Sequence, residues 1–266
     1  MSTASEYVHG HHQSVLRSHA WRTAENSAAY LLPHLRPEMD VLDVGCGPGT
    51  ITVDLASRVP GGRVMGVDTS AEVLSRAADL AVAQGVDNVE LEQADATALP
   101  YSAESFDVVH AHQLLQHLSD PVAALREMRR VLRPGGILAV RDADYGGMRW
   151  FPDDEGLERW RDLYLALTSH HHPDAGRKLL SWGLEAGFRT VTPSASVWCF
   201  ADAESRSWWA GTWAERVEHS SFATHAVDGG HATPDELADV ARAWRDWASL
   251  DDAWFVVVHG ELLARP

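Results

Sequence analysis

The chain has 266 residues and a formal net charge of −16, because 38 acidic side chains outnumber 22 basic ones. This acidic balance argues against a nucleic-acid binder, which needs clustered lysine and arginine. With 45% hydrophobic and 23% charged residues, the composition is that of an ordinary globular protein, long enough to bury a full core.

The N-terminal residues and the cysteine content narrow the class of protein further. The first residues, MSTASEYVHGHHQS, hold no basic stretch followed by an apolar run, and no window reaches the roughly 20 apolar residues that a membrane span needs. We therefore expect a cytoplasmic protein with no membrane attachment. Cys46 and Cys199 are too few for a disulfide framework or a cysteine-rich zinc site.

Residues 38–142 alternate short apolar runs with helical periodicity, which is typical of parallel strands joined by crossover helices. The predicted fold class is α/β, with a Rossmann-like, doubly wound and mostly parallel sheet. Thr69 and Glu72 have the spacing of a capping box, and Gly85 can close the helix that they begin. Asp120 and Pro121 have the pattern of another helix start. Five strands are expected here, at residues 41–44, 63–67, 89–92, 106–110 and 137–140.

Beyond Asp142 the pattern changes, since the Gly146-Gly147 pair precedes an aromatic helical segment. We interpret this segment as an insertion over the sheet. The predicted domains are an N-terminal helical lid at 1–37 and one domain at 38–266, with helical cap insertions at about 143–175 and 201–251. The later elements expected are helices at 157–167 and 179–188, a strand at 191–200, an aromatic region at 208–213, a helix begun by Thr233, Pro234 and Glu236, and a strand at 254–263.

The segment 41–50, VLDVGCGPGT, runs from an apolar strand through a tight glycine turn into a helix. Glycine lets the backbone approach a ligand closely. The spacing is G-x-G-x-G, because Thr50 stands where a dinucleotide fingerprint has its third glycine, so a nicotinamide dehydrogenase is disfavoured. Asp43 favours a binding role, since an acid within an apolar strand is costly unless it is paired. A structural turn with no ligand is the alternative.

Carboxylates also follow the next two predicted strands. Asp68 lies about 20 residues beyond the first glycine, where an acid of α/β nucleotide folds accepts hydrogen bonds from ribose hydroxyls. It could equally cap the helix that follows it. Asp95 follows the third strand, where a carboxylate could accept from the exocyclic amine of an adenine. Three such elements at successive strand ends favour a ligand site over a separate structural role for each.

Four motifs in order and spacing resemble the class I S-adenosylmethionine-dependent methyltransferases, and within them the ubiquinone and menaquinone biosynthesis methyltransferases (methyltransferase type 11/25 domain). These motifs are VLDVGCGPGT at 41–50, GVDTS at 66–70, ADATALPYSAESFDVVHAHQLLQHLSDP at 94–121 and VLRPGGILAV at 131–140. The resemblance covers residues 38–142 strongly and the remainder weakly. It implies a seven-stranded sheet with an antiparallel last strand, S-adenosylmethionine as cofactor and S-adenosylhomocysteine as product.

The resemblance also implies cofactor contacts. Asp43 and the loop 45–49 would hold the methionine part, Asp68 the ribose hydroxyls, and Asp95 with the Ala96 backbone the adenine. An N-terminal segment ordered over the cofactor would add three further residues. In full, the predicted cofactor-binding residues are Asp43, Gly45, Cys46, Gly47, Gly49, Thr50, Asp68, Thr69, Asp95, Ala96, His112, Gln113, His117, Tyr7, His12 and Arg22.

His112 is the predicted catalytic residue. Methyl transfer from a sulfonium is an in-line displacement, which chiefly needs acceptor and methyl carbon held close, aligned and away from water. A base helps where the acceptor is a phenol, an amine or a carbon acid. His112 ends the fourth strand, where ligands of open α/β sheets bind, and its imidazole titrates near neutral pH. It stands where related enzymes keep a polar residue, often Asn; a structural or cofactor-contacting role is the alternative. His117 fits helix packing better.

The second half of the chain bears on the acceptor. Ten of the 11 tryptophans lie from Trp150 onward and suggest an apolar pocket for a planar or lipophilic molecule. Helical spacing of Trp160, Trp244 and Trp247 suits core packing instead. Histidines cluster at 9–12 and 170–172, but neither cluster has cysteine or paired acids at zinc-motif spacing, so no metal is expected.

Together these features predict an S-adenosylmethionine-dependent methyltransferase that acts on a small, aromatic or quinone-like molecule. We expect a monomer or homodimer whose partner is this small-molecule acceptor, with no nucleic-acid or membrane partner. Two alternatives remain, because a fold does not fix its function. One is non-methylating chemistry with bound S-adenosylmethionine, and the other is a non-catalytic cofactor-binding protein.

Overall fold

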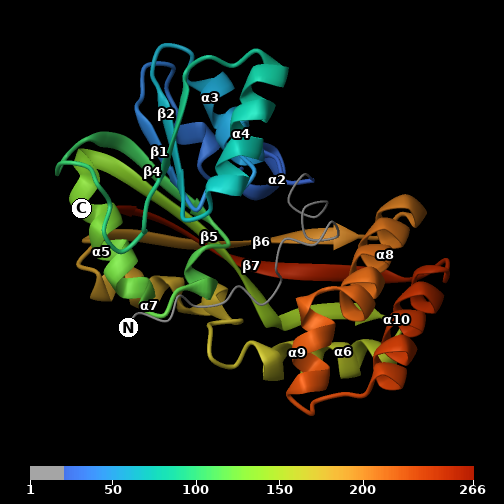
Figure 1. Cartoon of the computed structure of the whole chain (residues 1–266). Helices are drawn as coiled ribbons and strands as arrows, with labels where there is room; N and C mark the ends of the chain where they lie inside the picture. Colours follow the sequence, from blue (N-terminus) through green and yellow to red (C-terminus); the bar gives the residue numbers. More distant parts are fainter. Residues whose placement is uncertain (1–20) are drawn as a thin grey trace. The chain divides into compact units, whose positions relative to one another are not determined.

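The computed structural model describes residues 21–266 and divides them into two compact units (Figure 1). The N-terminal unit comprises the described residues up to Asp142 together with Ala175–Ser196 and His259–Pro266. The tryptophan unit comprises Ala143–Asp174 and Val197–Val258. The predicted sites Tyr7 and His12 lie outside the described residues.

Seven strands form one sheet in the order β3-β2-β1-β4-β5-β7-β6. The pairs β1–β2, β1–β4, β2–β3 and β4–β5 are parallel, and the last strands are antiparallel, so the predicted Rossmann-like fold is confirmed. The strands are β1 (Val41–Val44), β2 (Val64–Asp68), β3 (Val89–Gln93), β4 (Phe106–His112), β5 (Leu132–Phe151), β6 (Thr190–Phe200) and β7 (Trp254–Arg265).

Strand β5 is much longer than the sequence pattern predicts. Its apolar run ends at residue 140, but the strand continues through Gly146-Gly147 to Phe151. All ten residues from Gly136 to Tyr145 are buried. The charged side chains among them interrupt the apolar pattern, but the strand continues. The predicted end was wrong because a glycine pair and charged residues resemble a turn when sheet pairing is not visible.

Two helix starts show how local chemistry sets element boundaries. Helix α5 (Pro121–Val131) begins as predicted, with the Ala123 N–H donating to Oδ1 of Asp120 at 2.8 Å. Helix α4 (Ala71–Gln84) has Ser70 as its N-cap, so the predicted cap at Thr69 is wrong by one residue. The Ser70 N–H donates to the Asp68 carboxylate at 3.0 Å, which fixes Ser70 at the boundary. The unit's other helical segments are α2 (Ala24–Ser27), η1 (Leu32–His34), α3 (Thr50–Arg58), η2 (Leu115–His117), η3 (Ala175–Lys178) and α7 (Leu179–Glu185).

Apolar clusters cover both faces of the parallel strands. Val41 and Val108 belong to the cluster that includes residues of α2 and α3, whereas Leu42 and Val109 belong to the cluster that includes residues of α5 and α7. Successive strand residues point to opposite faces, so both faces are buried, as in a doubly wound sheet.

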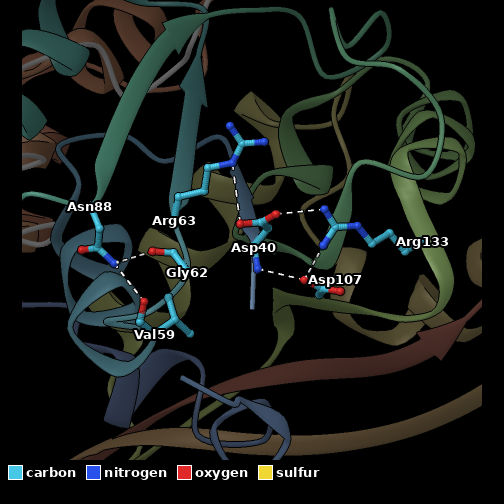
Figure 2. A network of polar contacts seen from close by, with 7 residues as sticks. All are labelled: Asp40, Val59, Gly62, Arg63, Asn88, Asp107 and Arg133. Atoms are coloured by element: carbon cyan, nitrogen blue, oxygen red, sulfur yellow. Dashed lines mark hydrogen bonds and ion pairs between the residues drawn. The ribbon is translucent and has the colours of Figure 1, made fainter. Parts of the chain in front are cut away.

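Charged side chains tie together the amino ends of the central strands (Figure 2). Arg133 donates to Asp107 at 2.6 Å and to Asp40 at 2.9 Å, and Arg63 lies 3.6 Å from the other oxygen of Asp40. Nearby, the side-chain amide of Asn88 donates to three backbone carbonyls at the end of α3 and in the loop before β2. Each carboxylate and guanidinium named here therefore has an opposite charge within reach.

In the tryptophan unit, helices α6 (Glu155–Leu167), α8 (Ala203–His219), α9 (Ser221–Asp228) and α10 (Pro234–Ala248) pack against one another (Figure 1). The predicted capping box of α10 is confirmed, since Thr233 and Glu236 each accept from the other's N–H. Trp160 is fully buried, with its ring 4.6 Å from that of Trp213 and 5.0 Å from that of Trp244, both edge to face. These indole rings therefore pack in the core of the unit, as the helical spacing of the tryptophans indicated. No helix within residues 21–266 is long and apolar enough to cross a membrane.

Candidate active site

The glycine loop after β1 adopts backbone conformations that require glycine. Gly45, Gly47 and Gly49 have φ of 72°, 53° and 84°, in the left-handed region. A Cβ at Gly49 would lie 2.6 Å from the Cβ of Ala77 on α4. Next in the loop, Cys46 is buried, which raises the pKa of its thiol and leaves it protonated. The loop leads directly into α3, which begins at the predicted contact residue Thr50.

Asp68 at the end of β2 contacts this loop directly. The Gly47 N–H donates to Oδ2 of Asp68 at 3.1 Å, while Oδ1 accepts from Ser70 at the start of α4. Of the two roles that the sequence left open for Asp68, the structure shows the contact at the helix start, and ribose binding stays a prediction. Each carboxylate oxygen has a second lone pair for a further donor. Thr69 is exposed, and its carbonyl accepts from Gln93.

Asp95 lies beyond the end of β3, and the structure shows its contacts within its own turn. Its Oδ1 accepts from the N–H and the hydroxyl of Thr97, at 2.8 and 2.7 Å. Asp95 is exposed, whereas Ala96 beside it is buried. The Ala94 N–H donates to the Asp68 carbonyl at 3.1 Å, which joins the ends of β2 and β3.

Asp43 lies inside the sheet rather than in the loop. It is 3% exposed; its Oδ1 lies 2.7 Å from Nδ1 of His110, and its Oδ2 accepts from Thr52 at 2.6 Å. A carboxylate only accepts, so Nδ1 of His110 carries the proton. The opposite ring nitrogen, Nε2, is buried and has no hydrogen-bond partner among residues 21–266. Asp43 is thus paired, as the sequence indicated. Its partner is His110, which the sequence did not identify.

The end of β4 brings three predicted residues together. His112 is buried, and Gln113 follows it with an unusual φ of 50°. The Arg22 guanidinium donates to Oε1 of Gln113 at 2.7 Å. On its other side, Nε2 of Gln113 lies 2.8 Å from Nε2 of His259 on β7. The rings of His112 and His259 are nearly parallel, with centroids 6.1 Å apart.

The surroundings of His112 determine its protonation. Burial lowers its pKa well below the ordinary value of a histidine, and the positive charges of Arg141 and Arg22 lower it further. His112 is therefore neutral near pH 7, and a neutral imidazole is the form that can accept a proton.

Several buried charged residues at this edge were not predicted as site residues. Arg141 donates to Ser196 at 3.1 Å and lies 3.4 Å from Glu261. Asp142 accepts from the Gln116 N–H through Oδ1, while its Oδ2 has no hydrogen-bond partner among the described residues. Burial raises the pKa of Asp142 to about 7. The signal was present in the sequence, because these charges interrupt apolar strands just as Asp43 does.

His117 follows Gln116, the residue whose N–H donates to Asp142. It ends the short helix η2, and its Nε2 lies 3.0 Å from the side-chain amide of Gln116. Across residues 21–266, no group of three or more His, Cys, Asp or Glu side chains is arranged to hold a metal ion.

Known proteins resemble both the sequence and the fold. Residues 35–188 match the family described as "Methyltransferase domain". An uncharacterized methyltransferase of Schizosaccharomyces pombe is 34% identical, over 97% of this chain and 95% of its own. A ubiquinone/menaquinone biosynthesis C-methyltransferase of Bdellovibrio bacteriovorus is 42% identical, over 38% of this chain and 42% of its own. The solved structure of the YcgJ protein of Bacillus subtilis aligns with a TM-score of 0.60 at 22% identity, over 91% of this chain and 98% of that one.

A Rossmann-like sheet with a glycine loop, and with acids at its carboxyl edge, is typical of enzymes that bind an adenosine-containing cofactor. The chain belongs to the methyltransferase domain family, and it is an S-adenosylmethionine-dependent methyltransferase. Its residues fit the cofactor: the loop keeps three glycines in conformations that other residues rarely adopt, and Asp68 is bonded to that loop with lone pairs still available.

Proposed function

We propose that the enzyme methylates a small molecule whose accepting atom carries a proton, with His112 as the base. The sulfonium of S-adenosylmethionine supplies the methyl group. The acceptor atom forms its bond to the methyl carbon while the carbon–sulfur bond breaks, and the acceptor's proton passes to His112. The products are the methylated acceptor, S-adenosylhomocysteine and a protonated His112, which returns its proton to water.

The position of His112, buried at the carboxyl end of β4, carries this proposal. A buried imidazole that stays neutral near pH 7 is available as an acceptor of protons at the carboxyl end of β4. Ligands of open α/β sheets bind at this edge. A histidine kept only for packing would be better replaced by an apolar side chain, since burial of a polar ring costs free energy.

For the cofactor, we propose the contacts that the family resemblance implies. The loop 45–49 would hold the methionine part, with Asp43 behind it, and Asp68 would accept from the ribose hydroxyls. Asp95 and the Ala96 backbone would contact the adenine. The hydrogen bond between Asp68 and Gly47 supports this proposal, because it joins the carboxylate that we assign to the ribose to the glycine loop.

An aromatic or quinone-like acceptor remains our first candidate class. The relative named as a ubiquinone/menaquinone C-methyltransferase supports it, although the similarity covers 38% of this chain. The tryptophan content gives less support than the sequence suggested, because the central indoles pack on one another in the tryptophan unit.

The test uses the full-length protein, S-adenosylmethionine and a panel of phenols, hydroquinones, aliphatic alcohols and carboxylic acids, with S-adenosylhomocysteine formation as the readout. We expect turnover with at least one phenol or hydroquinone. His112→Asn should lower kcat by about 10²–10⁴, while the Kd of S-adenosylhomocysteine stays within threefold. His34→Asn, at an exposed histidine of the same unit, is the matched control and should behave as the wild type. Full turnover by His112→Asn would overturn the role of His112.

A further inference from the structure

A chain of hydrogen bonds joins three side chains that lie far apart in the sequence. Arg22 precedes α2, Gln113 follows β4 and His259 lies on β7, within the same unit. The Arg22 guanidinium meets Oε1 of Gln113 at 2.7 Å, and Nε2 of Gln113 meets Nε2 of His259 at 2.8 Å. The Gln113 backbone N–H also donates to the Arg141 carbonyl at 2.7 Å, which holds the residue in its left-handed conformation.

This chain fixes the tautomer of His259. A guanidinium has only donors, so the atom of Gln113 that faces Arg22 must be the accepting oxygen. The amide nitrogen of Gln113 is then turned toward His259 and donates. Nε2 of His259 must accept, and in the neutral ring the single proton sits on Nδ1. An imidazolium would place two N–H groups face to face, so the hydrogen-bond pattern disfavours a charge on His259.

The consequence concerns His112, whose ring lies nearly parallel to that of His259. Two imidazoles this close do not both take a proton readily, because the first positive charge opposes the second. If His259 took up a proton, His112 would be a weaker base. Among the described residues, Arg141, Arg22 and His110 add positive charge near His112, while Tyr30 and Glu261 face Arg141 and Asp142 interacts with both arginines.

We propose that His259 is a positioning residue of the methyl-transfer site: Arg22, acting through Gln113, holds it in the neutral Nδ1–H tautomer beside His112. His112 is thereby left as the group that takes the acceptor's proton, so the functional consequence rests on the role of His112 given above. No motif of the sequence marks His259, which lies in the apolar last strand.

The tautomer can be measured without any acceptor. In full-length protein with ¹⁵N-labelled histidine, the His259 signals are identified by their loss in His259→Gln. We expect Nδ1 protonated and Nε2 unprotonated in the wild type at pH 7. Gln113→Glu is isosteric and presents only acceptors, so it should move the proton to Nε2 or protonate both nitrogens. Arg22→Met releases the amide and should give a mixture of tautomers. Gln84→Glu, on an exposed position of α4, is the charge control and should match the wild type.

Two results would overturn the inference: a protonated Nε2 in the wild type, or the same tautomer in wild type, Gln113→Glu and Arg22→Met. A rate measurement adds a functional readout. With an acceptor from the panel above, His259→Gln should lower kcat at least tenfold and leave the KM for S-adenosylmethionine within threefold; an undiminished kcat would contradict a positioning role. Because the tautomer is read without turnover, a failure here is distinguishable from a failure of His112 as base.

Discussion

The polar and charged side chains at the two ends of the central strands differ in how exposed they are and in whether they are paired. At the amino ends, Arg133, Asp40 and Asp107 are partly exposed, and each meets an opposite charge (Figure 2). At the carboxyl ends, His110 and Asp142 are fully buried, and each keeps one polar atom with no hydrogen-bond partner among residues 21–266. At the amino ends the charged side chains therefore pair with one another. At the carboxyl ends, His110 and Asp142 each keep an atom that could form one more hydrogen bond.

This difference suggests that the amino-end contacts stabilise the fold, whereas the carboxyl-end groups serve the reaction. A buried polar atom without a partner costs about 1–3 kcal/mol, so folding alone does not favour such atoms at the carboxyl ends. We propose that these atoms are kept for ligand binding and proton transfer at the carboxyl ends of β4 and β5. The amino-end network, by contrast, ties strand starts together and should matter for stability alone.

The largest expected effect concerns the pH dependence of methyl transfer. An unperturbed histidine base would lose about tenfold in rate per pH unit below pH 6.5. Because burial and the neighbouring arginines lower the pKa of His112, kcat/KM should stay level through pH 6.5 and fall only at lower pH. A rate profile from pH 5 to 9 checks this. An acid limb centred on pH 6.5 would contradict the buried, neutral state of His112.

Asp142→Asn should change how stability depends on pH. The folded protein holds the Asp142 proton up to about pH 7, whereas the unfolded chain loses it near pH 3.8. The folded state thus binds more protons between these values, and its stability falls as pH rises through this window. Asparagine stays neutral, so the variant should be more stable above pH 7, by up to about 4 kcal/mol, and equal below pH 4. Urea unfolding at pH 4 and 8 measures this; Asp79→Asn on the exposed face of α4 is the control.

Gly49→Ala and Gly85→Ala form a matched pair that tests packing at the glycine loop. Both positions have positive φ, but a Cβ at Gly49 would lie 2.6 Å from Ala77, whereas nothing lies within 4 Å of one at Gly85. Gly85→Ala should cost about 1 kcal/mol for its backbone conformation. Gly49→Ala should cost about 1–3 kcal/mol more, because overpacking adds to it. Equal unfolding free energies for the two variants would show that the loop shifts without cost.

The smallest effect is expected at the amino ends. Arg133→Met removes the cation shared by Asp40 and Asp107 and should lower the free energy of unfolding by ~1 kcal/mol, because these side chains are partly exposed. The Kd of S-adenosylhomocysteine should stay at its wild-type value, which calorimetry checks. A weakened Kd in a folded Arg133→Met protein would mean that the two ends of the sheet are not functionally separate.

The residues that sequence reasoning located are those fixed by local chemistry. The glycine loop, Asp68 and the start of α5 depend on neighbours within a few residues, and spacing alone identifies them. The N-cap of α4 was misplaced because two adjacent residues, Thr69 and Ser70, can both cap, and only the contact from Asp68 decides between them.

The contacts that the sequence could not predict are those between residues far apart in the chain, which come together only in the folded sheet. His110 faces Asp43 through the parallel register of β4 and β1, and Gln113, just beyond β4, meets His259 on β7. Composition likewise cannot tell core from pocket: the tryptophan count suggested an acceptor pocket, and the central indoles are packed against one another.

The most direct measurement is a calorimetric titration of the full-length protein with S-adenosylmethionine, S-adenosylhomocysteine and NADH, repeated with Asp68→Ala and the exposed-acid control Asp79→Ala. We expect micromolar binding of both sulfur compounds and none of NADH. Asp68→Ala should weaken the binding about 10- to 100-fold through the lost hydrogen bonds, and Asp79→Ala should bind as the wild type does. Equal affinities of Asp68→Ala and the wild type would contradict a cofactor site built on the glycine loop and Asp68.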